Sequence, residues 1–193
     1  PLTSEDLAEH EAGFSSIGTY TLVPTGDEFQ VRFVVFDLDV MDPAKLAWLK
    51  HSVEWAVDPL GDEGAYKCLL LEKSGGKGYH IWLFLDGWTP AYKVRAWLDQ
   101  RFWPEYNRGP EEAKYDKLEV FPKQDRLSEG GLGNLTKLPF GVHAVSGQRS
   151  ELVGCERWAS GADEVVGMDT AEIRAVPDRT PEERVMVTRS TPT

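Results

Sequence analysis

Short apolar runs along the chain predict a succession of strands and helices. Runs rich in β-branched and aromatic residues, bounded by turn-forming residues, are typical of strands. The turn-like sequence PTGDE separates the first two runs, and Gly75-Gly76-Lys77-Gly78 separates the third from the fourth. The strands are expected at 17–23, 31–39, 68–74, 79–86 and 118–121.

Apolar residues at helical spacing predict two helices between these strands. The first starts at Asp42, a good N-cap residue, followed by Pro43 at the first helical position, and it reaches about Val57. The second runs from Pro90 to about Phe102. Strands and helices that alternate in this way indicate a mixed α/β fold.

The ends of the chain give weaker signals. A polar helix from Glu5 to Glu11, capped by Thr3 or Ser4, is expected to lie outside the core. After the last strand we expect a Gly-rich loop, an extended segment, a weak terminal helix that starts at a capping box, and a frayed tail. They lie, in that order, at 128–134, at 135–145, from 180 onward and at 187–193.

Length and composition indicate a globular chain of one domain or of two tightly joined lobes. The 193 residues are 41% hydrophobic and 11% aromatic, which argues against general disorder and allows a sizeable core. The sequence contains no internal repeat and no convincing linker. We therefore treat residues 1–193 as a single domain. The sequence motifs that bear on its chemistry lie within about 17–150.

Charge is distributed unevenly along the chain. The formal net charge of −11 argues against a nucleic-acid coat protein or an anionic-membrane binder. Residues 1–66 carry −10, residues 67–149 carry +3, and residues 150–193 carry −4. The middle third can therefore present a local anion-binding surface although the whole chain is acidic.

Cysteine usage and hydropathy bear on the compartment. Two cysteines, Cys68 and Cys155, are too few for a four-cysteine zinc site and suggest no disulfide framework, so a reducing compartment is the default. The chain has no apolar run of membrane-spanning length and no signal-peptide pattern at its start. We expect a cytoplasmic protein without a membrane partner. The missing initiator Met favours a piece of something longer or a chosen boundary.

Asp37 and Asp39 form a paired carboxylate at the end of a very apolar strand. The two-residue period of a strand places both side chains on one face. Two anions so close repel each other unless a divalent cation lies between them, which favours Mg²⁺ or Mn²⁺. The alternative is a pair of strand-end acids that cap the following helix, although Asp42 already occupies that cap.

The sequence SGGKGYH at 74–80 supplies a hydroxyl, an ammonium, an imidazole and the free backbone N–H groups of a glycine turn. Such groups suit a triphosphate. The segment is not a Walker A loop, because a strand follows where a helix should begin. The alternative is an ordinary hairpin with an exposed lysine and a histidine in the sheet.

Glu119 lies between Leu118 and Val120 in a short apolar strand. A buried carboxylate there needs a partner, and a metal shared with the aspartate pair would provide one. Basic residues follow it and are expected to form a cluster opposite the acids, although each alone is more simply a solvated surface charge. They are Lys123, Arg126 and Lys137.

Taken together, four segments resemble the archaeo-eukaryotic primase superfamily in order and spacing. They are DLD at 37–39, LEKSGGKGYHIWLFL at 71–85, LEVFPKQD at 118–125 and GGLGNLTKLPFG at 130–141. Within the superfamily, the chain looks most similar to the primase-polymerases of TOTE conflict systems and to CRISPR-associated primase-polymerases. Beyond Ser150 the resemblance fades.

The resemblance implies a two-lobed α+β core, with an N-terminal αβ unit beside an RRM-like unit and the active site between them. It implies that Asp37, Asp39 and Glu119 are catalytic and bind two divalent ions, Mg²⁺ or Mn²⁺. Many relatives carry Asp at the third position and Glu as the second member of the pair, so this chain departs from the common pattern twice while keeping three carboxylates.

The resemblance also implies a set of phosphate-binding and template-binding residues. The hydroxyl and imidazole of the family's second motif fall on Ser74 and His80, with Lys77 as a helper. The nucleotide or phosphate contacts it suggests are Ser74, Gly75, Lys77, His80, Lys123, Gln124, Asn134 and Lys137, and the template contacts are Arg126 and Arg149.

The function so implied is DNA-directed nucleotidyl transfer from (d)NTPs, which makes or extends primers on a single-stranded template and releases pyrophosphate. Further domains of a longer polypeptide, or associated helicase or CRISPR proteins, are the expected protein partners. Two other hypotheses remain open, a metal-dependent nuclease that uses the same acids and a nucleotide- or DNA-binding module that has lost catalysis. Pyrophosphate release, and incorporation under Mn²⁺ or Mg²⁺, discriminate between them.

Overall fold

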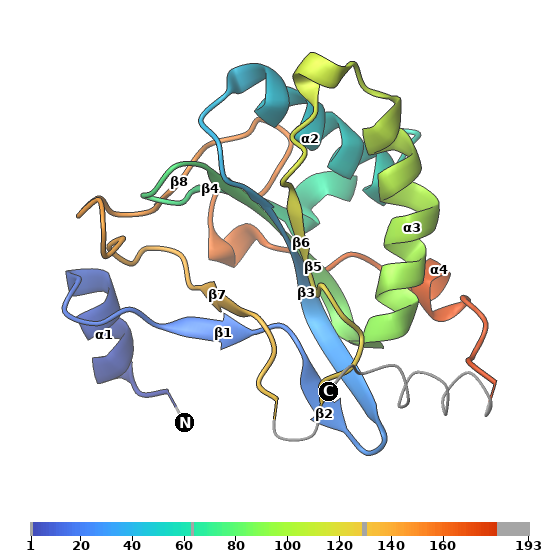
Figure 1. Cartoon of the computed structure of the whole chain (residues 1–193), viewed down its shortest axis with the longest axis horizontal. Coiled ribbons are helices and arrows are strands. Elements are labelled where there is room, and N and C mark those ends of the chain that lie inside the picture. Colours follow the sequence, from blue (N-terminus) through green and yellow to red (C-terminus); the bar gives the residue numbers. More distant parts are fainter. Residues whose placement is uncertain (1, 63, 129–130, 181–193) are drawn as a thin grey trace.

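Strands and helices alternate along the chain, as the apolar pattern predicts (Figure 1). The computed structural model describes residues 2–62, 64–128 and 131–180. The terminal helix and the frayed tail expected from the sequence fall on 181–193, outside the described residues. The strands are β1 (Gly18–Tyr20), β2 (Val23–Thr25), β3 (Glu28–Leu38), β4 (Leu69–Lys73), β5 (Tyr79–Pro90), β6 (Glu119–Phe121), β7 (Leu135–Lys137) and β8 (Glu151–Leu152).

Four α-helices and three 3-10 turns complete the described residues. The helices are α1 (Ser4–Ala12), α2 (Pro43–Val57), α3 (Ala91–Arg108) and α4 (Ala171–Arg174). The 3-10 turns are η1 (Ala65–Cys68), η2 (Glu111–Ala113) and η3 (Ala162–Glu164). The mixed α/β class expected from the sequence is confirmed.

The main sheet has six strands, and every pair in it is antiparallel. Its order is β2-β3-β5-β4-β8, and β6 lies against the outer edge of β3. Along the chain, β3, α2, β4, β5, α3 and β6 follow the βαββαβ order of ferredoxin-like and RRM domains. The four strands of this unit lie in the order β6-β3-β5-β4, which is the RRM-like unit implied by the resemblance.

The local sequence explains the start of α2. The Asp42 carboxylate accepts hydrogen bonds from the backbone N–H groups of Ala44, at 2.9 Å, and Lys45, at 3.3 Å. Pro43 occupies the first helical position, where its missing N–H has no consequence. The buried face of the helix then packs against the sheet through Leu49 and Val53. The predicted bounds of this helix are confirmed.

Helix α3 is longer than the sequence predicts. Pro104 lies inside it, and the helix continues to Arg108 because Phe102 and Tyr106 are buried against the core on either side of the proline. Its last turn is held by α2, where the Trp48 indole N–H donates to the Tyr106 carbonyl at 2.9 Å. Such a contact between two helices has no signal in a local sequence window.

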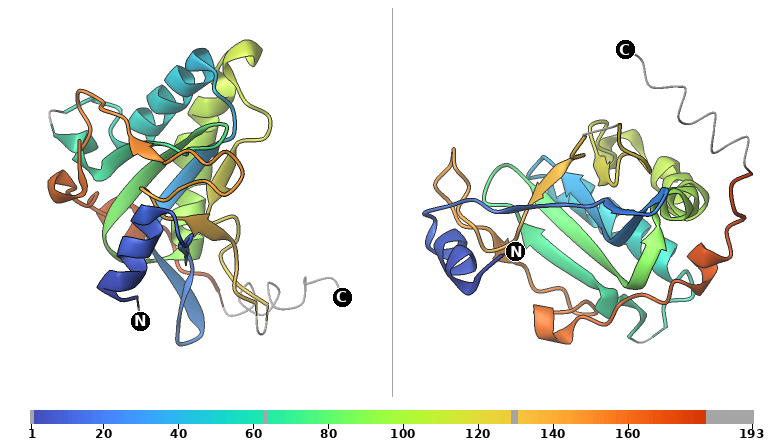
Figure 2. Two further views of the ribbon diagram at one scale, coloured as in Figure 1. Left: turned by 90° about the vertical axis from the view of Figure 1, so that its left-hand side faces the viewer. Right: turned by 90° about the horizontal axis from the view of Figure 1, so that it is seen from below.

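Both faces of the sheet are apolar, but they are covered differently. On one face, α2 and α3 bury side chains such as Phe36 and Ile81 in the main core. On the other face, Val35, Trp82 and Phe121 form a smaller cluster. Figure 2 shows α1 at one end of the molecule and α3 at the other. Neither α2 nor α3 contributes to this smaller cluster.

A small two-stranded sheet lies beside the main one. The sequence predicts a single strand at 17–23, whereas the structure divides it, so that β1 pairs with β7 and β2 pairs with β3. Helix α1 packs on this unit through His10, which is buried although the helix is otherwise polar and exposed. The expectation that α1 lies outside therefore holds for every residue of the helix except this one.

The segment after β7 is mostly a turn, and the extended conformation expected for 135–145 is wrong beyond Lys137. The ladder with β1 ends where the Leu138 N–H donates to the Ile17 carbonyl at 2.9 Å. The next carbonyls, of Leu138 and Pro139, face the His10 ring instead. Phe140 then adopts a left-handed conformation, with φ of 70°. The chain turns because a side chain from α1 takes the place of a neighbouring strand.

None of the helices in the described ranges is both long and apolar enough to cross a bilayer.

Candidate active site

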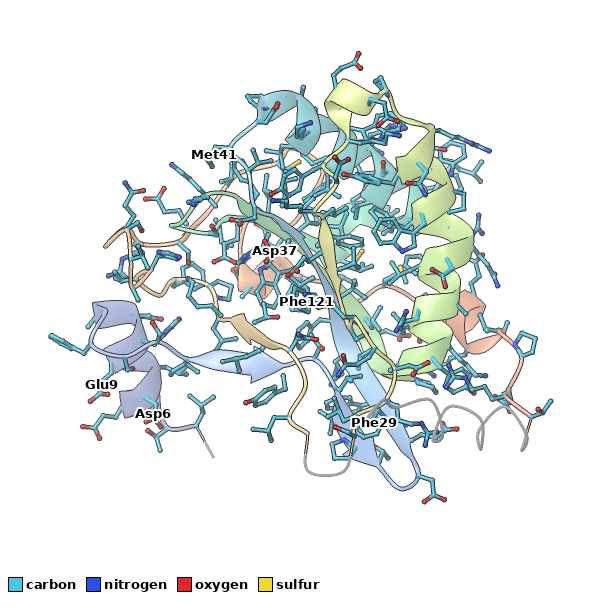
Figure 3. All side chains as sticks on the ribbon, in the orientation of Figure 1. Asp6, Glu9, Phe29, Asp37, Met41 and Phe121 are labelled. Atoms are coloured by element: carbon cyan, nitrogen blue, oxygen red, sulfur yellow. The ribbon has the colours of Figure 1, made fainter. Side chains whose placement is uncertain are left out.

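A cleft of about 470 Å³ opens between the main sheet and the small β1–β7 sheet. Its walls come from the segment before β1, the end of β3, the β4–β5 turn, β7 and the loop at 143–145. Asp37 and Phe121, which both line it, lie near the middle of the molecule in Figure 3. Six of the residues singled out from the sequence line this one cleft: Asp37, Asp39, Ser74, Lys77, His80 and Lys137.

Strand register places four ionisable side chains in one row across the sheet. Glu119 of β6 is opposite Asp37 of β3, Asp37 is opposite His80 of β5, and His80 is opposite Glu72 of β4. Directly opposed residues in antiparallel strands project from the same face. In order across the sheet, the row therefore consists of two acids, an imidazole and a third acid, on the face away from α2 and α3.

Asp37 and Asp39 differ in their surroundings. Asp37 is half-buried at the end of β3, whereas Asp39 is exposed just beyond it. Burial raises the pKa of Asp37, and the neighbouring carboxylates of Asp39 and Glu119 raise it further, while His80 opposes this rise. The carboxylates of Asp39 and Glu119 thus repel that of Asp37, as expected for anions so close together.

Glu119 is less buried than expected from its apolar strand. Its side chain is 49% exposed, and its carboxylate Oε1 forms an ion pair with Lys123 Nζ at 2.6 Å. Both residues line a neighbouring cavity between β6 and α3 rather than the cleft itself. The expectation that Glu119 is buried is therefore wrong, and the cation beside its carboxylate is the Lys123 ammonium.

Glu72 is the most buried charge of the row and was not singled out from the sequence. Its side chain is fully buried, and Oε2 accepts hydrogen bonds from His80 Nδ1 and Trp82 Nε1, both at 2.9 Å. Burial opposes ionisation, but the His80 and Trp82 hydrogen bonds together with the His80 charge hold the pKa of Glu72 below its ordinary value.

The orientation of His80 follows from this contact. An ionised carboxylate only accepts hydrogen bonds. His80 Nδ1 therefore carries a proton and donates the hydrogen bond to Glu72. The opposite nitrogen, Nε2, then faces the cleft and lies 3.6 Å from Asp37 Oδ1. Glu72 therefore acts on the site through His80, as a positioning residue, and its signal in the sequence is the acid at the end of the apolar run 68–71.

The β4–β5 turn presents Ser74 and Lys77 to the cleft. Ser74 is buried, and its hydroxyl oxygen accepts from the Gly76 N–H at 3.2 Å, which leaves its own O–H free to donate. Lys77 is exposed at the tip of the turn. Gly76 lines the cleft, whereas Gly75, the glycine singled out from the sequence, is buried under the backbone of 148–150.

Lys137 reaches the same cleft from β7. Its ammonium lies 3.9 Å from Glu72 Oε1 and 3.4 Å from the Gly141 carbonyl, which are long contacts. Burial lowers the pKa of Lys137, and the Glu72 charge opposes this. Glu72 Oε1 has no hydrogen-bond partner among the described residues. The lysine is thus held loosely over a buried acid and can turn toward an anion in the cleft.

The remaining candidates are not gathered into the basic cluster that the sequence suggests. Lys123 pairs with Glu119 in the neighbouring cavity, whereas Lys137 lies in the cleft. Gln124 and Asn134 are half-buried and do not line the cleft. Outside the cleft lie also the two candidate template residues, Arg126, which is half-buried, and Arg149, which is exposed and donates to the Phe140 carbonyl at 2.7 Å.

Further polar side chains line the cleft without having been singled out, among them Thr136 and His143. Thr136 of β7 is buried, and its hydroxyl has no partner within the part of the chain described. His143 follows in the next loop. Local sequence gave no signal for either, because each reaches the cleft only through the pairing of β7 with β1 and the turn that follows.

The carboxylates fit divalent cations in residue type, and they fit in part by position. Asp37 and Asp39 line the cleft, and burial raises the pKa of Asp37, with the Asp39 and Glu119 carboxylates adding to this rise. No group of three metal-ligating side chains is assembled within the described residues. Glu119 has the register to join the pair, but its carboxylate is turned to Lys123.

Fold and cleft together define an RRM-like α+β domain with an acidic pair facing basic groups across a cleft. A family model, described as the archaeo-eukaryotic primase domain of TOTE conflict systems, matches residues 1–173. The chain therefore belongs to this family, which is associated with nucleotidyltransferase activity of the primase type. The match extends beyond Ser150, where the sequence resemblance had faded. A comparison with curated proteins finds no match.

Proposed function

We propose that this chain is a DNA-directed primase-polymerase domain. It transfers nucleotides from (d)NTPs to a primer strand on a single-stranded DNA template and releases pyrophosphate. The observation that carries the proposal is that one cleft brings together the acidic pair, Asp37 and Asp39, and the phosphate-binding types of side chain, Lys77, His80 and Lys137. Family membership supports the same class of reaction.

The acidic end of the cleft is the place for the cations. Asp37 and Asp39 would hold two Mg²⁺ or Mn²⁺ ions, with Glu119 as a third carboxylate once it leaves Lys123. Bound there, such ions lower the pKa of a hydroxyl nucleophile and neutralise a departing pyrophosphate. The protein's own contribution is to keep two carboxylates together at the end of a rigid strand.

The other end of the cleft is the place for the triphosphate. The Ser74 hydroxyl, the Lys77 ammonium and the Lys137 ammonium are donors that suit phosphate oxygens. His80, oriented by Glu72, stands between the two ends. Preorganised donors of this kind stabilise the charge that develops on the phosphates during transfer. Arg126 and Arg149, outside the cleft, are candidates for template contact. Domains of a longer polypeptide, or associated helicase or CRISPR proteins, would complete the system.

The test is primer extension by the purified chain with Mn²⁺ or Mg²⁺, labelled nucleotides and a primed single-stranded template. Asp37→Asn should lower incorporation by at least about a hundredfold, because the cleft loses one of its two carboxylates. Asp27→Asn, at an exposed turn between β2 and β3, is the matched control and should keep full activity. Equal thermal unfolding of the three proteins would show that folding is intact.

Extension by the Asp37→Asn protein at the wild-type rate would overturn the proposal. The same reactions report on a nuclease, since DNA shortening without pyrophosphate release would identify hydrolysis instead of synthesis.

One observation favours a second candidate, a nucleotide-binding module without catalysis. The Glu119 carboxylate is engaged by Lys123 at 2.6 Å, and no three-ligand group is formed within the described ranges. If this pair persists when substrate binds, the cleft has two carboxylates and not three. Tight triphosphate binding with no incorporation under either metal would support this candidate, and a Lys123→Ala variant that gains incorporation would locate the block in this ion pair.

A further inference from the structure

A second histidine lines the cleft, beside the β4–β5 turn. His143 lies in the loop after β7 and is half-buried. A Cβ atom built on Gly76 would lie 3.0 Å from His143 Nε2, so the edge of the imidazole rests on the backbone of the turn. A side chain at position 76 would crowd the ring. The glycine therefore allows the ring to approach the turn that bears Ser74 and Lys77.

The hydrogen bonds of the ring decide which nitrogen carries the proton. The backbone N–H of Ser146 points at His143 Nδ1 over 3.2 Å. A backbone N–H only donates, so Nδ1 accepts and is unprotonated. In the neutral ring the proton is then on Nε2, the atom beside Gly76. His143 thus presents a hydrogen-bond donor at the wall of the cleft.

The loop that bears this histidine is fixed to the turn it faces. The His143 N–H donates to the Gln148 carbonyl at 2.8 Å, and the Gly147 N–H donates back to the His143 carbonyl at 2.9 Å. The Ser146 hydroxyl donates to the Gly75 carbonyl at 2.5 Å. Gly75 has φ of +76°, and a Cβ there would lie 2.6 Å from the Gln148 carbonyl oxygen. The two loops therefore form one wall with a set geometry.

The donors on this wall are not engaged by carboxylates. The ion pairs of the described residues engage His80, Lys123 and Lys137, each with a glutamate, but they do not include Lys77. At the His143 and Lys77 wall, two donors thus face the cleft with no internal anion beside them. An external anion can complete this arrangement, and terminal phosphates carry the charge and the acceptor oxygens that it lacks.

We propose that His143 binds the terminal phosphates of the incoming nucleoside triphosphate through Nε2–H, and that with Lys77 it forms a phosphate-binding wall of the cleft. This inference rests on the proposed function. It assigns to His143 a substrate-binding role that the sequence motifs did not indicate, and it explains why the loop at 143–148 is joined so closely to the β4–β5 turn.

Two substitutions separate the Nε2–H donor of His143 from the hydrogen bond that its Nδ1 accepts from Ser146. In His143→Asn the amide oxygen takes the position of Nδ1 and can still accept from Ser146, but the Nε2 donor is lost. In His143→Gln the amide nitrogen takes the position of Nε2 and keeps a donor there. His51→Asn, on the exposed face of α2, is the matched control.

The measurement is calorimetric binding of inorganic triphosphate to the 193-residue chain, followed by nucleotide KM and kcat in primer extension. We expect His143→Asn to weaken triphosphate binding and to raise KM by about tenfold, with kcat changed less than about threefold, because one hydrogen bond to an anion is lost. His143→Gln should bind within about threefold of wild type, as should His51→Asn.

The outcomes separate the two proposals. If wild type binds triphosphate and His143→Asn binds equally well with an unchanged KM, the role of His143 is excluded while the proposed function stands. If His143→Asn and His143→Gln are weakened equally, the ring acts through loop structure and the donor role is excluded. If wild-type chain binds no triphosphate, both proposals fail.

Discussion

At the residue scale, Glu72 positions side chains of the cleft although it does not itself line the cleft. Glu72 is fully buried and receives hydrogen bonds from His80 and Trp82, while Lys137 lies above its second oxygen. Through these contacts a single carboxylate links β4, β5 and β7. An uncompensated charge at such a site would cost several kcal/mol, so His80 and Glu72 depend on each other.

Glu72→Gln tests this dependence through stability. The pKa of Glu72 is lowered in the folded state, so its ionised form stabilises the fold above the ordinary glutamate pKa, and this contribution is lost as pH falls through the folded value. We expect the substitution to lower the free energy of unfolding by about 1–3 kcal/mol at pH 7. The difference should shrink below roughly pH 4.5.

Urea unfolding of both proteins from pH 7 to pH 3 measures this difference. Glu156→Gln, at an exposed loop position, provides the control and should match wild type at every pH. A difference that stays constant or grows on acidification would show that the Glu72 charge does not stabilise the fold.

The sequence located some of these residues and missed others for a physical reason. Asp37 and Asp39 were found because two-residue periodicity is a local property of one strand. His80 was found from its motif, but its partner Glu72 was not, because their contact exists only once the β4–β5 hairpin sets their register. His143 depends on a loop that is fixed to a distant turn, because Ser146 contacts Gly75, which lies 71 residues earlier in the sequence.

At the element scale, α2 was predicted from local sequence signals, whereas the division into β1 and β2 depends on contacts with distant strands. Asp42 and Pro43 fix the start of α2 and act within one turn of the helix, so this start could be predicted from the sequence. The run at 17–23 has the composition of one strand, yet Gly18–Tyr20 pair with β7, whereas Val23, at its end, pairs with β3. Strand composition favours extended backbone but does not say which neighbour completes the ladder.

The small β1–β7 sheet owes its position to His10 of α1. The Ile17 N–H donates to His10 Nδ1 at 3.0 Å, so Nε2 carries the proton and faces the carbonyls of Leu138, at 3.2 Å, and Pro139, at 3.0 Å. The ring also fills the space beside Gly141, where a Cβ would lie 2.0 Å from it. One side chain thus connects a helix, the start of β1 and the end of β7.

His10→Ala should therefore loosen this unit without affecting the main sheet. We expect a loss of about 1–3 kcal/mol in the free energy of unfolding, because buried backbone groups lose their partner. Amide hydrogen exchange should become faster at 17–20 and 135–141 and stay unchanged in α2 and α3. Glu9→Gln, on the exposed side of α1, is the control. Uniform acceleration in all elements would instead indicate that His10 supports the whole fold.

At the scale of the whole molecule, the cleft lies in a protein of net charge −11. Most of the excess acid belongs to residues 1–66 and 150–193, whereas the +3 segment at 67–149 contributes Lys77, His80 and Lys137 to the cleft. The acidic surroundings oppose the approach of a polyanion, and the local donors favour its phosphates. Their balance predicts that this chain alone binds a DNA strand weakly.

Salt dependence measures how many phosphates the chain contacts. For two to three contacts on a single strand, affinity should fall about tenfold between 50 and 200 mM salt. Fluorescence anisotropy with a labelled single-stranded oligonucleotide gives the slope of log K against log salt. Arg126→Ala and Arg149→Ala should each reduce that slope by about 0.7 if the arginine neutralises one phosphate. The Asp27→Asn control should not reduce it, and a slope unchanged by both arginine substitutions would place the template path elsewhere on the surface.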